Sequence, residues 1–234
     1  MRRLNFEVLT LFPDIIVGSL NESILKRGRE KGLLEVTVRN IRDYADDKHK
    51  TADDSPYGGG AGMVLKPEPF FEAVAGLDEA SRQGPIVLLS ARGRRFGHED
   101  AVRLSLEQRL TLLCGHYKDV DQRVAEGLAT EELSLGDFVL SGGEPAAIAV
   151  IDAVVRLLPG VLGDHESAAG DSHYDGLLSP PSYTRPPMYG GRAVPQVLLS
   201  GNHAEIDVWR RDEAERMTRE RRPDLWSDYQ TKHR

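Results

Sequence analysis

Short apolar segments, separated by stretches of helical character, constrain the fold of this chain more than any other feature. They recur at Leu4–Phe12, Leu34–Val38, Ile86–Leu89, Leu110–Cys114 and Phe138–Leu140. Parallel strands are covered by helices on both faces and therefore read as continuous apolar runs between turn residues. The alternation of such runs with helical stretches predicts an α/β fold with a mainly parallel sheet.

Two prolines indicate where helices begin. Pro13 precedes Ile15, Ile16 and Leu20, and Pro145 precedes the almost wholly apolar segment Ala146–Leu158. Proline suits the first helical turn, because the N–H that it lacks would have no helical partner there. We therefore predict a helix after each proline, the second of them buried.

The composition changes at Gly163–Ser172, where small and polar residues show neither a helical nor a strand period. From Tyr174 to Arg234 the chain has ten basic and nine acidic residues, against 20 and 28 before it. We predict a domain over residues 1–161, a flexible interdomain linker over 162–173 and a small, mostly helical C-terminal domain over 174–234.

Charge and cysteine content exclude several classes of protein. The net charge of −7 argues against a protein that coats nucleic acid through bulk charge, so any such contact must be local. The lone Cys114 can form neither an internal disulfide nor a zinc cluster, which favours a reducing cytoplasm. The histidines lack metal-ligand spacing, and no apolar run approaches the ~20 residues of a membrane helix.

Three predicted strands end alike, in LLSARG (Leu88–Gly93), LLCGHY (Leu112–Tyr117) and FVLSGG (Phe138–Gly143). Ligands of open α/β sheets bind outside the carboxyl ends of the strands. A single such end is more often an ordinary strand-to-helix turn, but three together predict one binding site. The P-loop and dinucleotide glycine signatures are missing from the sequence.

Four further features leave a structural and a functional interpretation open. The run Gly58–Gly62 is either a mobile connection or a loop that closes over a ligand. Asp152 and Arg156, four apart on one helix, either neutralise each other or place a guanidinium in a cleft. Asp171 is either a solvated loop residue or a general base.

The fourth feature is the arginine-rich segment Asp207–Arg222, which is either a solvated, ion-paired helix or a grip for phosphates. Nearby Trp209 and Tyr183 offer faces on which bases could stack.

Four long blocks carry a resemblance that covers nearly the whole chain. They are Asp53–Met63 (DDSPYGGGAGM), Ser134–Glu144 (SLGDFVLSGGE), Tyr183–Pro186 (YTRP) and Leu198–Ile206 (LLSGNHAEI). In these blocks the chain resembles the bacterial tRNA (guanine-N1)-methyltransferases of the TrmD family. The blocks are in order, so together they are far more specific than any single glycine motif.

The resemblance implies a SPOUT fold, in which the sheet ties a deep trefoil knot whose loops bind S-adenosyl-L-methionine. True knots are rare, and periodicity alone would not predict one. Carried over residue by residue, the implied cofactor contacts are Leu88, Leu89, Ser90, Gly115, Tyr117, Ser134, Leu135, Gly136, Asp137, Phe138, Val139, Leu140, Ser141, Gly142 and Gly143.

The same resemblance implies a cytoplasmic enzyme that transfers a methyl group to N1 of guanosine 37, beside the anticodon of tRNA. It implies a homodimer with a shared active site, bound to tRNA and to neither DNA nor membrane. Arg156 matches the family arginine that contacts the target guanine, and Asp171 matches the family base. Assistance by Mg²⁺ is also implied, although no carboxylate cluster in the sequence designates a metal site.

One block departs from the family pattern. The usual Gly-Arg-Tyr-Glu-Gly-Ile-Asp is Gly-His-Tyr-Lys-Asp-Val-Asp over 115–121, so Lys118 replaces a glutamate beside the cofactor and Asp119 is its nearest substitute. Two alternatives therefore stay open. One is a knotted methyltransferase that acts on a ribose 2′-hydroxyl or another base, and the other is an RNA-binding module without catalysis.

Overall fold

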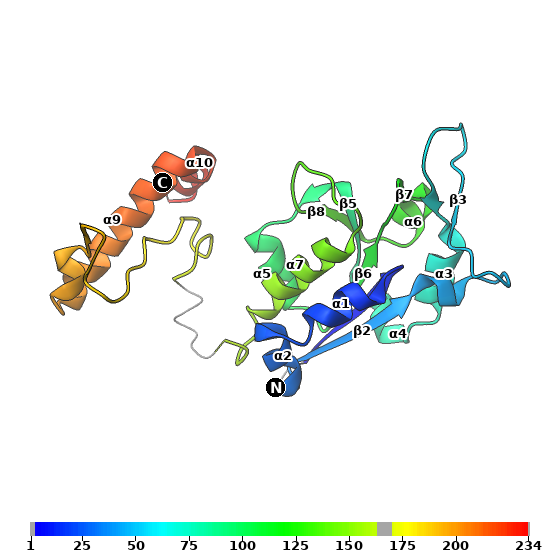
Figure 1. The fold of residues 1–234 in the computed structure, drawn as a ribbon, viewed down its shortest axis with the longest axis horizontal. Helices are drawn as coiled ribbons and strands as arrows, with labels where there is room; N and C mark the ends of the chain where they lie inside the picture. Colours follow the sequence, from blue (N-terminus) through cyan, green and yellow to red (C-terminus); the bar gives the residue numbers. More distant parts are fainter. Residues whose placement is uncertain (1–2, 163–169, 234) are drawn as a thin grey trace. The chain divides into compact units, whose positions relative to one another are not determined.

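Five parallel strands form the central sheet of the computed structural model, which describes residues 3–162 and 170–233 (Figure 1). Their order is β2-β1-β6-β5-β8, and each neighbouring pair is parallel. The strands are β1 (Leu4–Thr10), β2 (Leu34–Asn40), β5 (Ile86–Arg95), β6 (Arg109–Cys114) and β8 (Glu131–Ser134). The predicted α/β fold with a mainly parallel sheet is confirmed.

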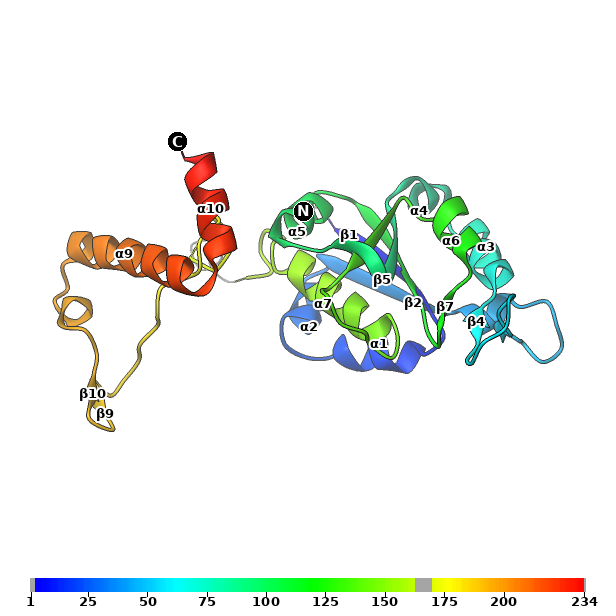
Figure 2. The ribbon, with the colours of Figure 1, turned by 90° about the horizontal axis from the view of Figure 1, so that it is seen from above.

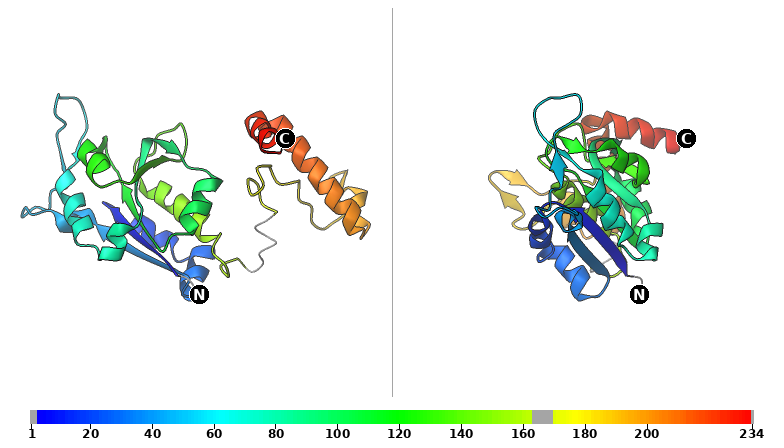
Figure 3. Two further views of the ribbon diagram at one scale, coloured as in Figure 1. Left: turned by 180° about the vertical axis from the view of Figure 1, so that it is seen from behind. Right: turned by 90° about the vertical axis from the view of Figure 1, so that its right-hand side faces the viewer.

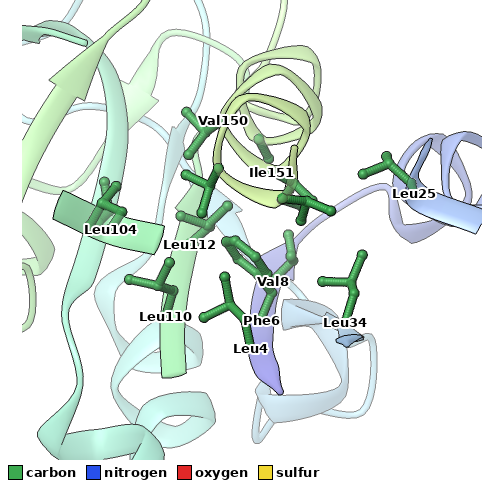
Figure 4. Close-up of a cluster of buried hydrophobic side chains, with 14 of the residues drawn as sticks. Leu4, Phe6, Val8, Leu25, Leu34, Leu104, Leu110, Leu112, Val150 and Ile151 are labelled. Atoms are coloured by element: carbon green, nitrogen blue, oxygen red, sulfur yellow. The ribbon is translucent and has the colours of Figure 1, made fainter. Parts of the chain in front are cut away.

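Successive residues of these strands point to opposite faces of the sheet, and both faces are buried. In β6, Leu110, Leu112 and Cys114 belong to one hydrophobic cluster. Leu113, which lies between Leu112 and Cys114 in the strand, belongs to the other. Figure 4 shows the first cluster, in which Val150 and Ile151 of a long helix lie over the strands. Burial on both faces explains why the strands read as continuous apolar runs.

The helices divide between the two faces (Figure 2). The first cluster is covered by α1 (Pro13–Ser19), α2 (Ser23–Glu30), α5 (His98–Ser105) and α7 (Glu144–Val155), and the second face carries the 3-10 helix η1 (Ile41–Tyr44), α3 (Pro67–Ala75), α4 (Glu79–Gln83) and α6 (Gln122–Gly127). Pro13 and Pro145 stand in the first turns of α1 and α7, as predicted.

The prediction of a strand at Phe138–Leu140 is wrong. The fifth strand is the more polar segment Glu131–Ser134, and after it the chain turns at Gly136, whose φ of +155° lies where side chains are rarely accommodated. Phe138, Val139 and Leu140 are 55%, 86% and 40% exposed. Their apolar side chains belong to a loop rather than to the core, which is why the apolar run is misleading.

Beside the main sheet lies a small one, of order β3-β4-β7. Its strands are β3 (Asp53–Asp54), β4 (Val64–Leu65) and β7 (Asp119–Val120). The glycine run Gly58–Gly62 lies in the long loop between β3 and β4, which projects from the domain in Figure 3. The parallel pairing of β4 with β7 places the base of this loop beside the chain that follows β6.

The chain divides into two compact units, Met1–Gly163 and Asp164–Arg234. Most of the expected linker, residues 163–169, lies outside the described residues. The second unit contains β9 (Met188–Tyr189), β10 (Arg192–Ala193), the 3-10 helix η2 (Gln196–Leu199), α9 (His203–Arg221) and α10 (Pro223–Lys232). Buried Thr218 ties α9 to the preceding loop, because its hydroxyl accepts a 2.8 Å bond from the N–H of Leu178.

An ionic cluster fixes the outer end of β5. Leu89 and Arg94 both pair with Leu133 of β8, so the chain between them bulges out of the ladder. Arg94 holds Asp100 of α5 in a bidentate pair of 2.6 and 2.9 Å, and the same carboxylate accepts a bond from the N–H of Gly97. The bulge is thereby anchored to α5.

We expect Asp100→Asn to lower the free energy of unfolding by about 1–2 kcal/mol at neutral pH. Arg94 holds the pKa of the Asp100 carboxyl below its ordinary value. This stabilisation is therefore complete above about pH 4, the unfolded value, and is lost as the pH falls through the lower folded pKa. Urea unfolding of both proteins from pH 7 to pH 2 tests this, with exposed Glu30→Gln as control. A difference that persists unchanged at pH 2 would contradict it.

Candidate active site

The middle of β5, the end of β8 and the chain that follows β6 and β8 line one pocket at the carboxyl edge of the sheet. Its lining residues are Leu89, Ser90, Ala91, Arg92, Gly115, His116, Tyr117, Lys118, Asp119, Leu133, Ser134, Leu135, Gly136, Phe138, Val139, Leu140, Ser141, Gly142, Gly143 and Ala146. The three similar segments that the sequence singled out therefore meet here, although the third is a loop. We call the segment 134–143 the pocket loop.

The pocket loop lies directly against the end of β6. The N–H of Gly143 donates a 2.8 Å bond to the carbonyl of Gly115, and Gly142 bridges to His116. A Cβ at Gly143 would lie 2.8 Å from the Cα of Cys114 and 3.0 Å from the Gly115 nitrogen. These partners are backbone atoms and cannot move aside, so the close approach requires glycine.

The glycines serve packing within the protein. A Cβ at Gly142 would collide with the Glu144 carboxylate and the His116 ring, so this glycine is required by packing within the protein. We expect Gly143→Ala to lower both the thermal midpoint and ligand affinity, because the loop must leave β6. Differential scanning calorimetry and titration calorimetry test this against Gly18→Ala, which has open space around it. A normal midpoint for Gly143→Ala would contradict the packing.

The walls of the pocket combine apolar side chains with backbone polar groups. Phe138, Val139 and Leu140 stand at its rim, and the hydroxyl of Ser134 bonds to the pocket loop itself at Gly136. Tyr117 has a left-handed backbone with φ of +60°, which turns the chain sharply after β6. Such a lining suits a ligand with a flat aromatic part and polar edges.

Charged groups lie on the side of the pocket that faces the β3–β4 loop. Arg92 of the β5 bulge pairs with Asp119 at 3.1 Å. Lys118 lies against the glycine run, with its Cβ 3.5 Å from the position of a Cβ on Gly62. The side chain that replaces the family glutamate thus contacts the glycine loop.

A buried polar group underlies the pocket. The Glu144 side chain is 1% exposed, and its Oε1 accepts a 2.6 Å bond from the hydroxyl of Thr10 at the end of β1. Its Oε2 lies 3.7 Å from Nδ1 of His116. Burial and the Glu144 charge raise the pKa of the Cys114 thiol, which makes a thiolate nucleophile there unfavourable.

Known proteins resemble this chain over nearly its whole length. The family model described as tRNA (Guanine-1)-methyltransferase TrmD matches residues 4–228. A tRNA (guanine-N(1)-)-methyltransferase of Dehalococcoides mccartyi (strain CBDB1) is 55% identical over 95% of this chain and 90% of its own. The protein of the same name from Anoxybacillus flavithermus is 52% identical over 97% and 93%, and that of Geobacillus kaustophilus is 50% identical over 97% and 93%.

The chain belongs to the TrmD family. Within this TrmD family member, thirteen of the fifteen expected cofactor residues line the pocket. The other two are Leu88, whose side chain is 1% exposed and packs in the second hydrophobic cluster, and Asp137, which is exposed on the pocket loop.

Neither of the two expected catalytic residues is one of the residues that line the pocket. Arg156 is the C-cap of α7, and Gly143 and Ala146 at the other end of this helix line the pocket. Twelve helical residues span about 18 Å. Asp171 is half-buried in the second unit, where its carbonyl accepts a bond from the N–H of Tyr174.

Sequence reasoning missed some lining residues and the buried group beneath them. Those in the lining are Leu133 and Ala146, and those beneath it are Thr10 and Glu144. Ala91, Arg92 and His116 lie in the predicted strand-end segments but had no assigned contact, and Lys118 and Asp119 were expected beside the cofactor. His116 and Glu144 adjoin the glycines of their motifs, which is the one signal that could have found them. The bulge that brings Arg92 to the pocket has no counterpart in the apolar pattern.

The second unit has a hollow of its own, whose lining includes Tyr183, Trp209, Arg185 and Arg210. The Tyr183 and Trp209 rings lie 6.4 Å apart between centroids. Three arginines of α9 and its C-cap Arg222 are engaged within the unit. Arg210 pairs with Asp207, Arg216 with Glu213 and Glu220, and Arg222 with Asp224, while Arg219 lies over Trp226.

Over residues 3–162 and 170–233, no three His, Cys, Asp or Glu side chains are grouped so that they could hold a metal ion. In the same part of the chain, every helix is too short or too polar to cross a membrane.

Proposed function

We propose that this chain transfers a methyl group from S-adenosyl-L-methionine to N1 of guanosine 37 in tRNA. The observation that carries the proposal is the pocket formed where the pocket loop meets the end of β6, in a chain that belongs to the TrmD family over residues 4–228. We infer that the family's deep trefoil knot lies where the pocket loop meets the end of β6. We also infer a cytoplasmic location.

The pocket fits the methyl donor chemically. The backbone N–H and C=O groups at Gly115 and in the pocket loop can form hydrogen bonds with the polar edges of the donor. The apolar side chains of Leu89, Phe138 and Leu140 can pack against its adenine ring. When bound, the donor supplies an electrophilic methyl group on its sulfonium. The task of the protein is then to present guanine N1 in line and to remove its proton.

Guanine N1 is a poor nucleophile because it carries a proton and its lone pair is conjugated with the ring amide. When the proton leaves, negative charge spreads to O6. Asp171 takes this proton in our proposal, and the planar guanidinium of Arg156 stabilises the charge that develops on O6. Neither step needs a protein nucleophile.

The position of Arg156 supports a homodimer with a shared active site. Within one chain, α7 keeps Arg156 about 18 Å from the helix end that lines the pocket. Because a helix keeps its length, an Arg156 that meets the pocket comes from a partner subunit in our proposal. We propose that the pocket of one subunit is completed by Arg156 and Asp171 of the other.

The second unit is the proposed tRNA-binding domain, with Tyr183 and Trp209 as stacking surfaces. The near balance of ten basic and nine acidic residues from 174 to 234 favours local contacts over bulk attraction. Mg²⁺ remains a proposed aid to the reaction without an assigned protein site.

The decisive experiment is incubation with unmodified tRNA and labelled S-adenosyl-L-methionine, followed by nuclease digestion and mass spectrometry. We expect 1-methylguanosine at position 37. A methyl group found only on ribose would favour a different knotted methyltransferase. Binding of tRNA without binding of the methyl donor would favour an RNA-binding module.

A further inference from the structure

The imidazole of His116 occupies an unusual position between a buried carboxylate and the pocket. Its Nδ1 has almost no accessible surface and no hydrogen-bond partner among the described residues. Oε2 of Glu144 lies 3.7 Å from this nitrogen. A buried polar nitrogen without a partner is costly, so the arrangement calls for a functional reason.

Glu144 is itself firmly placed. It begins α7, is 1% exposed, and receives the 2.6 Å bond from Thr10 on its other oxygen. The bridge between His116 and Gly142 holds the histidine backbone against the pocket loop. The ring is flanked by Phe12 at 4.6 Å and Tyr117 at 4.9 Å between centroids. The imidazole therefore has little freedom except to move toward or away from Glu144.

The exposed surface of the His116 side chain belongs to atoms other than Nδ1. His116 lines the pocket and its side chain is 20% exposed, yet Nδ1 contributes almost none of this surface. Nδ1 is thus buried beside a carboxylate, whereas Nε2 is one of the atoms among which the exposed surface is divided.

We propose that His116 is a ligand-binding residue that Glu144 positions: Nδ1–H donates to Glu144, and Nε2 accepts a hydrogen bond from the bound methyl donor. The inference rests on the proposed function. Donation from Nδ1 fixes the tautomer, so Nε2 carries a lone pair and its partner must be a hydrogen-bond donor. Contacts of this kind are often long before the ligand arrives and shorten in the complex.

The methyl donor has donors of two kinds, the ammonium of its amino-acid part and the hydroxyl and amino groups of its adenosine part. The negative charge of Glu144 behind the ring makes Nε2 a better acceptor and favours a cationic partner. The other charged groups at the pocket are Arg92, Lys118 and Asp119. Asp119 is the acidic group among them, and it is already paired with Arg92. His116 is therefore well suited to accept a hydrogen bond from the ammonium.

Two amide variants separate the roles of the two nitrogens. In His116→Asn the side-chain amide can replace Nδ1 but not Nε2, whereas in His116→Gln it reaches the position of Nε2. We expect His116→Asn to keep a normal thermal midpoint and to bind S-adenosylhomocysteine about tenfold more weakly by titration calorimetry. His116→Gln should bind it within a few-fold of the unaltered protein, and His203→Gln in the second unit is the control.

A second ligand locates the group that is recognised. 5′-Methylthioadenosine lacks the amino-acid part, so its affinity should be unchanged in His116→Asn if Nε2 meets the ammonium. An equal loss for both ligands would place the contact on the adenosine part and still support the proposal.

The proposal for His116 would be overturned if both variants bound the ligands with the affinity of the unaltered protein. It would also be overturned if each loss of affinity were matched by a fall in the thermal midpoint. Failure of the proposed function would look different. An unaltered protein that binds neither ligand would show that the pocket does not hold the methyl donor, whereas a methyl group placed elsewhere than on guanosine 37 would leave the test of His116 as it stands.

Discussion

Asp171→Asn should lower the single-turnover rate of methyl transfer by about 10²–10⁴-fold, the usual range for loss of a general base. The amide keeps the size of the side chain but cannot take the N1 proton. Binding of the methyl donor and of tRNA should change little, because neither requires a basic group at this position. Rapid-quench assays with labelled S-adenosyl-L-methionine measure the rate, and calorimetry measures donor binding.

The pH profile gives an independent check on this role. At high pH the N1 proton leaves without help, so the variant should recover part of its rate, whereas a variant that is merely misfolded should not. Asp175→Asn is a matched control, since this exposed aspartate lies four residues further along the same segment and caps a turn at Leu177. Near-normal turnover of Asp171→Asn at neutral pH would make Asp171 an ordinary loop residue and direct the search for a base to Asp119.

Two inactive variants should restore activity when they are mixed. Ala91→Trp places a large ring at an exposed position of the pocket lining and should abolish donor binding, while Arg156→Ala removes the guanidinium and leaves the pocket intact. In a mixed dimer, the intact pocket of the Arg156→Ala subunit faces Arg156 of the other. Random exchange of subunits should therefore recover about a quarter of the unaltered activity, because half of the dimers are mixed and each has one complete site.

Each variant must first be shown to fold, by circular dichroism, and to be inactive alone. Ala91→Trp must also fail to bind the methyl donor by calorimetry, and Arg156→Lys tests whether charge without the planar fork suffices. A mixture that stays as inactive as its components, although mass spectrometry detects mixed dimers, would place the whole site within one chain.

Much of the first unit could be predicted from local pattern alone. The strands β1, β5 and β6 place side chains in both hydrophobic clusters, so their apolar runs are unambiguous, whereas the edge strand β2 contributes to one cluster only. Pro13 and Pro145 mark helix starts through the missing N–H. The fifth strand was not predicted because Glu131 and Glu132 make it polar. The exposed segment Phe138–Leu140 was predicted as a strand because its residues are apolar. Apolar side chains that cover a ligand look the same in sequence as those that cover a core.

The amino-acid sequence was enough to predict the parallel α/β class, the family and most of the pocket residues. The folded chain was needed to show that Gly143 abuts the backbone of β6, that the β5 bulge presents Arg92, and that Thr10, His116 and Glu144 meet at the pocket. Thr10 and Glu144 are 134 residues apart. Periodicity records which face of its own element a residue occupies, whereas contacts between the ends of different strands depend on the order in which the sheet brings those strands together.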